Sequence, residues 1–413
     1  MTAANSVGRI DADCCIAGGG PAGMMLGLLL ARAGVRVVVL EKHADFLRDF
    51  RGDTIHPSTL DVMQELGLLD EFLRRPHQEL REVSVRIGPE LARIADFRHV
   101  PAHCRFLMMM PQWDFLDFLA AHARRLPTFR LETRAEVGEL LGGDGRIAGV
   151  RAATPGGTLE VRAPLVVGCD GRHSTVRRCA GLASRDIGAP MDVLWMRLPR
   201  VAGDPGDLFG QVDAGRMLVM IDRGDYWQCA LVIPKGGDAQ IRARGLEALR
   251  QGLRALSPWL GDRVETLAGW DQVKLLTVTV DRLETWYKPG VLCIGDAAHA
   301  MSPVGGVGIN LAIQDAVAAA RLLAGPLRNG AVTDADLARV QRRREWPVRV
   351  TQAMQVAVQR RLISPVLAAR GEVHMPAFLR LFDRFPRLRR LPARFIGMGV
   401  RPEHVDSSIA PAR

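Results

Sequence analysis

The chain has 413 residues, of which 48% are hydrophobic and 24% charged, as in a folded protein large enough for two or three domains. Its net charge is +10, and all but four of its 55 basic residues are arginine. A basic surface can attract an anionic cofactor, an acidic substrate or a membrane, but no basic stripe alternates with aromatic residues, so nucleic acid is not expected. The seven cysteines lack CxxC or zinc spacing, which predicts buried free thiols, a reducing cytoplasm and no metal site. Neither a secretory signal nor a membrane span is expected.

The stretch from Asp13 to Glu41 predicts a strand, a glycine-rich turn, a helix and a second strand. Its glycines Gly18, Gly20 and Gly23 have the spacing of the dinucleotide-binding fingerprint, and Glu41 follows 23 residues after the first of them. The first glycine allows a tight turn, the second lets a pyrophosphate approach, and the third lets the helix lie close to the strand. The free N–H groups at the helix start would bind phosphates. A glycine-rich turn in an ordinary α/β core is the alternative.

Strand and helix patterns alternate through the rest of the first half. Residues 1–10 are expected to be disordered, and a loop with Arg51 leads into a helix that ends at Gly67. Alternating apolar positions then predict a β-hairpin excursion, followed by an amphipathic helix over 112–125 and further strands. The expected strands cover residues 83–87, 91–97, 104–110, 129–137 and 147–152.

The second half begins with a β-rich region over 186–280. One amphipathic helix is expected over 241–256, among strands at 193–196, 217–221, 227–233 and 273–280. The apolar run 291–294 suits the centre of a parallel sheet, and a long alanine-rich helix then ends near Leu323. The arginine-rich remainder is predicted to form a solvated helical layer, and membrane contact by its basic helices is the less favoured alternative.

Three loops that follow strands are expected to meet at the carboxyl ends of a doubly wound sheet. They are the glycine fingerprint, the loop at Asp170 and the loop at Asp296. Gly305 and Gly308 begin a helix without a preceding Ser, Thr or Asp cap, so its N–H groups can face a ligand. The positive end of such a helix would stabilise negative charge on a reduced flavin ring.

These three stretches resemble the three signatures of the group A flavoprotein monooxygenases, the aromatic hydroxylases of the para-hydroxybenzoate hydroxylase type. The first is Gly18-Gly19-Gly20-Pro21-Ala22-Gly23. The second is Asp170-Gly171-x-x-Ser174-x-Val176-Arg177. The third is Gly295-Asp296-Ala297-Ala298-His299 with Pro303 and Gly305-Gly306-x-Gly308-x-Asn310. The resemblance covers residues 10 to about 325.

The resemblance implies bound FAD, NADPH or NADH that binds transiently, and molecular oxygen. In the family, the reduced flavin forms a C4a-hydroperoxide that hydroxylates the substrate, so the cofactor carries the chemistry and no side chain is named as catalytic. The implied cofactor-binding residues are Gly18, Gly20, Pro21, Ala22, Gly23, Glu41, Lys42, Arg51, Gln112, Val137, Asp170, Gly295, Asp296, Pro303, Gly306, Val307, Gly308, Ile309 and Asn310.

The fold expected from the resemblance is α/β, with a Rossmann-like FAD-binding domain, an inserted and mainly antiparallel substrate sheet, and C-terminal helices. The FAD-binding domain would comprise 10–80, 111–185 and 281–330, the substrate domain 81–110 and 186–280, and the helices 331–413. An apolar pocket for an aromatic, polyketide-like or quinone-like compound would lie between that sheet and the flavin. Its candidate lining residues, for each of which a core position is favoured over a ligand contact, are Met108, Met110, Trp195, Met220 and Trp227.

Two other functions fit the same sequence. One is a flavin-dependent reductase or dehydrogenase of the same fold that inserts no oxygen. The other is a flavin-binding or partner-binding protein without enzymatic activity. The sequence leaves the oligomeric state open between a monomer and a homodimer.

Overall fold

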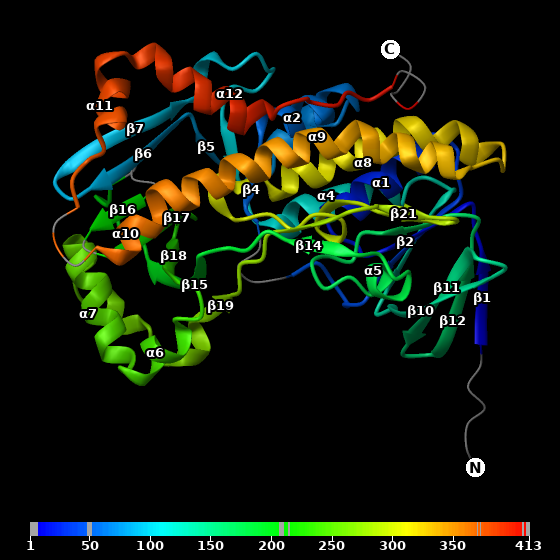
Figure 1. Ribbon diagram of the computed structural model, residues 1–413, viewed down its shortest axis with the longest axis horizontal. Coiled ribbons are helices and arrows are strands. Elements are labelled where there is room, and N and C mark those ends of the chain that lie inside the picture. The colour runs from blue at the N-terminus through cyan, green and yellow to red at the C-terminus, as the bar shows by residue number, and fades with distance from the viewer. Residues whose placement is uncertain are drawn as a thin grey trace.

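The computed structural model describes residues 7–47, 52–205, 210–213, 215–369, 371, 373–406 and 409. Arg51 lies outside the described residues. At the centre is a six-stranded sheet in the order β21-β22-β13-β2-β3-β9, parallel except for β21 (Figure 1). Its strands are Tyr287–Lys288, Val291–Cys293, Val166–Gly168, Cys14–Ala17, Val37–Glu41 and Phe129–Thr133. The predicted apolar strand β22 is therefore parallel and buried, but it lies next to the sheet edge rather than at its centre.

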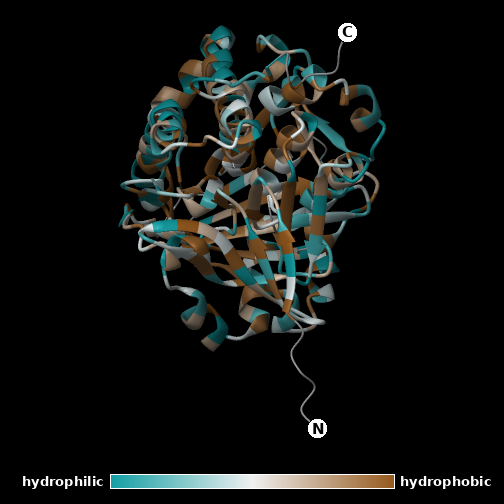
Figure 2. Cartoon of the chain, turned by 90° about the vertical axis from the view of Figure 1, so that its right-hand side faces the viewer, coloured by the Kyte–Doolittle hydropathy of each residue, from teal (hydrophilic) through white to brown (hydrophobic). Residues whose placement is uncertain are grey.

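Helices and a second sheet enclose this central sheet. Helix α1 (Pro21–Arg32) packs against α4 (Gln112–Ala123) and against α8 (Gly308–Arg328). In Figure 1 these helices lie above the central strands, and the four-stranded sheet β1-β12-β11-β10 lies below them. The strands of that sheet are Val7–Asp11, Gly157–Arg162, Arg146–Thr154 and Glu136–Gly143. Figure 2 shows the apolar residues concentrated on the inner strands and helices.

This arrangement corrects two expectations from the sequence. The supposed disordered lead is wrong for residues 7–10, because β1 pairs in parallel with β12. The single strand expected over 129–137 is also wrong, because Arg134, at a φ of 55°, ends β9 before β10 begins in the other sheet.

A seven-stranded, mainly antiparallel sheet has the order β19-β15-β18-β17-β16-β6-β7. Its strands are Lys274–Leu276, Met191–Pro199, Tyr226–Pro234, Arg216–Asp222, Gly210–Asp213, Glu82–Ile87 and Glu90–Asp96. One face is covered by α7 (Leu246–Leu256). The prediction of a single helix over 241–256 is wrong, because Gly245, at a φ of 88°, separates α7 from α6 (Asp238–Ala243). The strand expected over 273–280 is shorter, since β19 ends at Leu276.

Smaller elements connect these sheets. The strand expected over 104–110 is reduced to β8 (Leu107–Met109), which pairs with β4 (Thr54–Ile55) and β5 (Gln78–Leu80). Strands β14 (Ser184–Asp186) and β20 (Asp281–Leu283) form a two-stranded sheet. The short helices are α2 (Pro57–Glu65), α3 (Leu69–Leu73) and α5 (Thr175–Cys179).

The C-terminal segment is helical and touches both large sheets. Helix α9 (Asp334–Val358) lies along α8, continues through a π-helical turn at Gln359–Ile363, and reaches β17 and β18 through α10 (Ser364–Ala368) (Figure 1). Helices α11 (Ala377–Arg384) and α12 (Arg390–Met398) pack on β7. The structure thus has the predicted α/β fold with an inserted sheet and C-terminal helices.

Two further sequence expectations concern membranes and cysteines. The segment Val304–Arg328 is long and apolar enough to cross a membrane, but 83% of its most apolar window is buried, as in the core helix of a folded domain. All seven cysteines are free, and six are buried as predicted, whereas Cys179 is exposed. Burial raises the pKa of Cys15 to about 12 and that of Cys104 to about 11, so these thiols stay protonated.

Candidate functional site

The three predicted loops do meet at one edge of the central sheet. Strands β2, β13 and β22 are parallel, with β13 between the other two, and their carboxyl ends lead into Gly18, Asp170 and Asp296. Gly18, at a φ of 105°, lies so close to the next loop that a Cβ there would come within 2.4 Å of the Cys169 carbonyl oxygen. Arg172, from the second loop, lies 3.8 Å from the Asp296 carboxylate of the third. This edge is where open α/β sheets bind their ligands.

The start of α1 fits a phosphate group. No side chain among the described residues caps this helix, and Pro21 occupies its first turn. A Cβ at Gly23 would lie 2.0 Å from the Gly18 carbonyl oxygen, so the packing of helix on strand requires a glycine there. A Cβ at Gly20, by contrast, would meet nothing within 4 Å. The space at Gly20 and the free N–H groups match what a pyrophosphate needs.

Glu41, at the end of β3, is held against the glycine loop. Its carboxylate accepts hydrogen bonds from the backbone N–H of Gly19 at 2.9 Å and of His43 at 3.0 Å, and the residue is only 9% exposed. Lys42, the next residue, is exposed. The acid therefore lies beside the pyrophosphate space, where it can reach a ribose hydroxyl of a bound nucleotide.

A second helix N-terminus faces the same region. Helix α8 begins at Gly308 without a side-chain cap in the described structure, as predicted, and a Cβ at Gly308 would meet nothing within 4 Å. Pro303 and Val307 flank the preceding turn, in which Gly305 and Gly306 have positive φ angles. The helix N–H groups are thus available to a developing negative charge.

The side chain of Asn310 does not point to a ligand through its carbonyl oxygen. That oxygen accepts hydrogen bonds from the hydroxyl groups of Ser58 and Thr59, both at 2.8 Å, and the residue is buried. These bonds fix the N-terminus of α2 against the N-terminus of α8. Sequence reasoning missed this use of Asn310, because Ser58 and Thr59 lie about 250 residues earlier in the chain.

His56 connects the Gly306 turn to the C-terminal helices. Its Nε2 lies 3.0 Å from the Gly306 carbonyl oxygen, and its Nδ1 lies 2.7 Å from the Ile396 carbonyl oxygen in α12. The side chain is fully buried. Burial lowers the pKa of His56, although the two carbonyl contacts oppose this shift.

Asp53 is a buried carboxylate beside the same turn. It pairs with Arg223 at 2.8 Å and accepts a hydrogen bond from Gln228, both in the hairpin of β17 and β18. The preceding Gly52 contacts Ile309 and lies near Gln112, whose backbone N–H also binds Asp53. Burial raises the pKa of Asp53, and the charge of Arg223 offsets this only in part. The pair joins the loop of Gly52 and Asp53 to the large antiparallel sheet. No signal in the sequence predicted this contact.

Asp170 already has hydrogen-bond donors from its own loop. Its carboxylate accepts from the Ser174 hydroxyl at 2.5 Å and from the Val176 N–H at 3.1 Å. Ser174 in turn caps α5. The carboxylate therefore shapes this loop, and its predicted contact with a cofactor stays a prediction. Val137 lies in β10 and packs against the central core.

A buried ionic network supports the Gly295-Asp296 turn from behind. The Asp315 carboxylate accepts from the Gly295 N–H at 3.0 Å and from Arg344 at 2.8 Å, and it lies 2.6 Å from His299. Burial alone would raise the pKa of Asp315, but His299 and Arg344 together lower it. Arg344 also contacts Glu403 at 3.5 Å. Residues near the chain end therefore help to position a cofactor loop.

The positions of the five candidate pocket residues correct part of the predicted pocket lining. Trp195 lies on the face of the seven-stranded sheet that packs with Met109, and its role in a substrate pocket stays a prediction. Met220 and Trp227 are wrong as pocket residues, because they point to the opposite face under α7. Met108 and Met110 are also wrong, since they belong to the core of the central sheet. The side-chain alternation of a strand places neighbours on opposite faces, and here Met109 points to the cluster that contains Trp195.

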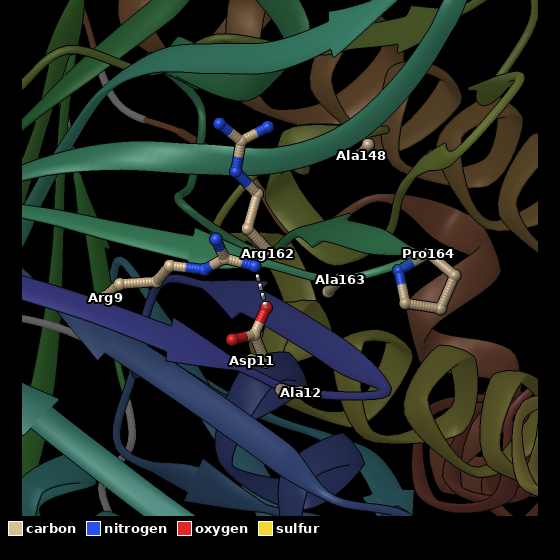
Figure 3. Close-up of a pocket in the computed structure, with 7 residues that line it drawn as sticks. All are labelled: Arg9, Asp11, Ala12, Ala148, Arg162, Ala163 and Pro164. Carbon is tan, nitrogen blue, oxygen red and sulfur yellow. Dashed lines mark hydrogen bonds and ion pairs between the residues drawn. The ribbon is translucent and has the colours of Figure 1, made fainter.

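A surface concavity of about 400 Å³ lies elsewhere (Figure 3). Its lining includes Arg9, Asp11, Ala12 and Arg162, which precede β2 or end β12. Arg9 pairs there with Asp11 at 2.9 Å. These residues lie before the amino end of β2, whereas Gly18 follows its carboxyl end. The concavity is therefore not part of the candidate site.

Two uncapped helix ends, the open space at Gly20 and Glu41 beside it define a site for a dinucleotide of the flavin type. The chain matches the family model described as "FAD binding domain" over residues 11–354 and belongs to that family. It is similar to a 6-methylpretetramide 4-monooxygenase of Streptomyces rimosus, with 33% identity over 354 residues that cover 85% of this chain and 84% of the relative. The protein is an FAD-dependent monooxygenase that uses NAD(P)H.

Solved structures show the same fold. PqsL of P. aeruginosa, in complex with 2-aminobenzoylacetate, has a TM-score of 0.73 at 26% identity and covers 91% of this chain and 100% of its own. The p-nitrophenol 4-monooxygenase PnpA of Pseudomonas putida DLL-E4 has a TM-score of 0.76, covering 94% of this chain and 97% of its own. At 23% identity, this second likeness shows the fold alone.

Proposed function

We propose that this enzyme hydroxylates an apolar aromatic compound of the polyketide or quinone type, in the cytoplasm. The observation that carries the proposal is the apolar sheet face with Trp195 and Met109. Ile396 packs on this face, and its carbonyl oxygen is linked through His56 to the Gly306 turn. The relative of known activity that acts on 6-methylpretetramide, at 33% identity, supports a multi-ring substrate. The proposed domain roles are FAD binding by 10–80, 111–185 and 281–330, and substrate binding by 81–110 and 186–280.

We assign each part of the bound FAD to a set of residues. The start of α1 at Gly18, Gly20 and Gly23 would bind the pyrophosphate, and Glu41 the ribose. Asp296 would bind a hydroxyl group of the ribityl chain. The N–H groups at Gly306 to Asn310 would face the flavin ring and stabilise its negative charge in the reduced state. FAD, when bound, supplies hydride acceptance from NAD(P)H and oxygen transfer to the substrate.

The protein side chains would orient the substrate and exclude water. Trp195, Ile221 and Ala230 offer an apolar surface for a planar ring system. An apolar, closed site also suppresses the side reaction in which reduced oxygen species are released and the substrate is not oxidised. No side chain is assigned a proton transfer, because the buried acids Asp53 and Asp315 are both occupied by arginine partners.

The proposal is tested with FAD-loaded enzyme, NADPH or NADH, and a panel of anthraquinones, naphthoquinones and simple phenols. We expect multi-ring compounds to accelerate NAD(P)H oxidation most, and the product to contain one atom of label from ¹⁸O₂. Accelerated oxidation with unlabelled product would favour a reductase or dehydrogenase instead. Equal acceleration by phenol alone would contradict the multi-ring substrate.

A further inference from the structure

Exposed apolar side chains are concentrated on one short part of the surface. Of the nine large apolar side chains that are exposed among the described residues, four lie between residues 378 and 391. Phe378, Leu381 and Phe385 follow one another at helical spacing on and just after α11, with exposed fractions of 48%, 45% and 51%. The opposite side of α11 is buried through Leu379. Leu391, at the start of α12, extends the stripe.

Arginines without acidic partners surround this stripe. Arg384, Arg387, Arg390 and Arg394 are exposed, and none of them has an ion pair within the described part of the chain. Their neighbours behave differently, because Arg380 pairs with Glu90 and Arg389 with Asp383. We call the exposed side chains of residues 378–394 the α11–α12 face.

The α11–α12 face lies close to the proposed substrate site. In Figure 1, α11 and α12 form the upper edge of the molecule, outside β6 and β7. On its inner side, α12 contributes Ala393 and Ile396 to the same apolar cluster as Trp195 and Met109. The α12 part of the face is therefore one helix away from the proposed substrate surface, whereas α11 packs through Leu379 on a separate apolar cluster with Val85 and Ile87.

We propose that the α11–α12 face docks on an anionic lipid surface. The apolar side chains would enter the boundary between headgroups and acyl chains, and the arginines would bind lipid phosphates. Helix α11 has eight residues and is about 12 Å long. The surface area of an apolar stripe on so short a helix is small compared with the roughly 800 Å² that each partner of a stable protein complex buries. A lipid surface needs no complementary shape and supplies diffuse negative charge for unpaired arginines.

The test uses full-length, FAD-loaded protein and vesicles of phosphatidylcholine with or without phosphatidylglycerol, in a co-sedimentation assay. We expect binding to phosphatidylglycerol vesicles to be stronger by about tenfold and to weaken with added salt. The variants F378S/L381S/F385S and R384Q/R387Q/R390Q should each lose most of this binding while NAD(P)H oxidation without vesicles is unchanged.

Matched controls remove similar side chains elsewhere. Trp346→Ser removes an exposed aromatic residue of α9, and R124Q/R125Q/R178Q removes three exposed arginines. Both should bind vesicles like the natural chain. Equal binding to both vesicle types, no binding, or equal losses in the controls would overturn the proposal. A shift from dimer to monomer in F378S/L381S/F385S, measured by light scattering, would instead show a contact between subunits.

Discussion

Gly20 and Gly23 stand three residues apart, yet they are glycines for different reasons. At Gly23 an added methyl group would collide with the Gly18 carbonyl oxygen, whereas at Gly20 it would meet no protein atom within 4 Å. Protein packing therefore explains only Gly23. The open space at Gly20 fits the proposal that a pyrophosphate approaches the backbone there.

This difference predicts opposite effects for two alanine variants. Gly23→Ala should lower the stability of the apoprotein by about 1–3 kcal/mol, because the overpacked helix must shift. Gly20→Ala should leave apoprotein stability within about 0.5 kcal/mol and weaken FAD binding by at least about tenfold. Urea unfolding and fluorescence titration with FAD measure the two quantities. Unchanged FAD affinity in Gly20→Ala would remove the pyrophosphate from this position.

His56 gives a prediction about pH. Because burial lowers its pKa in the folded chain, the unfolded chain binds a proton more readily below about pH 6.5. The free energy of unfolding should then decrease as the pH falls from about 7.5 to 5.5, and it should decrease less in His56→Gln. Chemical unfolding at several pH values measures this, with the exposed His173→Gln as the control. The same slope in His56→Gln and in the natural chain would show that His56 does not cause the loss.

At the scale of elements, strands β15, β17 and β18 show two apolar faces with different partners. Trp195, Ile221 and Ala230 pack with Met109 and with Ala393 of α12, whereas Met196 and Met220 face α7. The first is the face proposed to bind substrate, and the second is plain core. A strand with both faces apolar can serve both purposes at once.

The two faces predict different kinetics for two conservative variants. Trp195→Phe should raise KM for the substrate by about tenfold and increase NAD(P)H oxidation without product, because it enlarges the substrate site. Met220→Leu should leave KM unchanged and cost less than about 1.5 kcal/mol of stability. Steady-state kinetics with product quantification separates them. If both variants change KM equally, the assignment of the faces is wrong.

At the scale of the whole molecule, the Asp53–Arg223 pair joins the loop before β4 to the turn between β17 and β18 of the seven-stranded sheet. Both side chains are 5% exposed. Removal of one partner leaves a buried charge, so Asp53→Asn or Arg223→Met should cost about 3–5 kcal/mol of unfolding free energy. The double variant D53L/R223M should recover most of that loss, since neither charge remains. Urea unfolding of all three variants measures this, and purely additive losses in the double variant would exclude a direct coupling.

The sequence predicted the cofactor loops well because their signals are local. Each motif follows an apolar strand, and glycines mark turns whose geometry other residues cannot adopt. Faces within buried strands could not be assigned in this way. Residues 106–110 are all apolar and buried, so nothing in the pattern shows that Met109, rather than Met108 or Met110, packs with Trp195.

Contacts between residues that are distant in the chain could not be predicted from the sequence either. Arg223 reaches Asp53 across 170 residues, and Glu403 reaches Arg344 from the end of the chain. A charged residue in a sequence looks the same whether it is solvated or buried with a partner. The packing of α9 on α8 withdraws Arg344 from water, and the β17–β18 hairpin does the same for Arg223.

The ionic network behind Gly295 also has a consequence for the order of translation and cofactor binding. Asp315, Arg344 and Glu403 support that loop, and the last of them leaves the ribosome roughly 385 residues after Gly18. At about 5–20 residues per second, the interval is about 20–80 s. During this interval a nascent chain has its glycine fingerprint but not its complete flavin loop. We therefore expect stable binding of FAD only after Glu403 has been translated, so that newly made protein passes through an apoprotein stage.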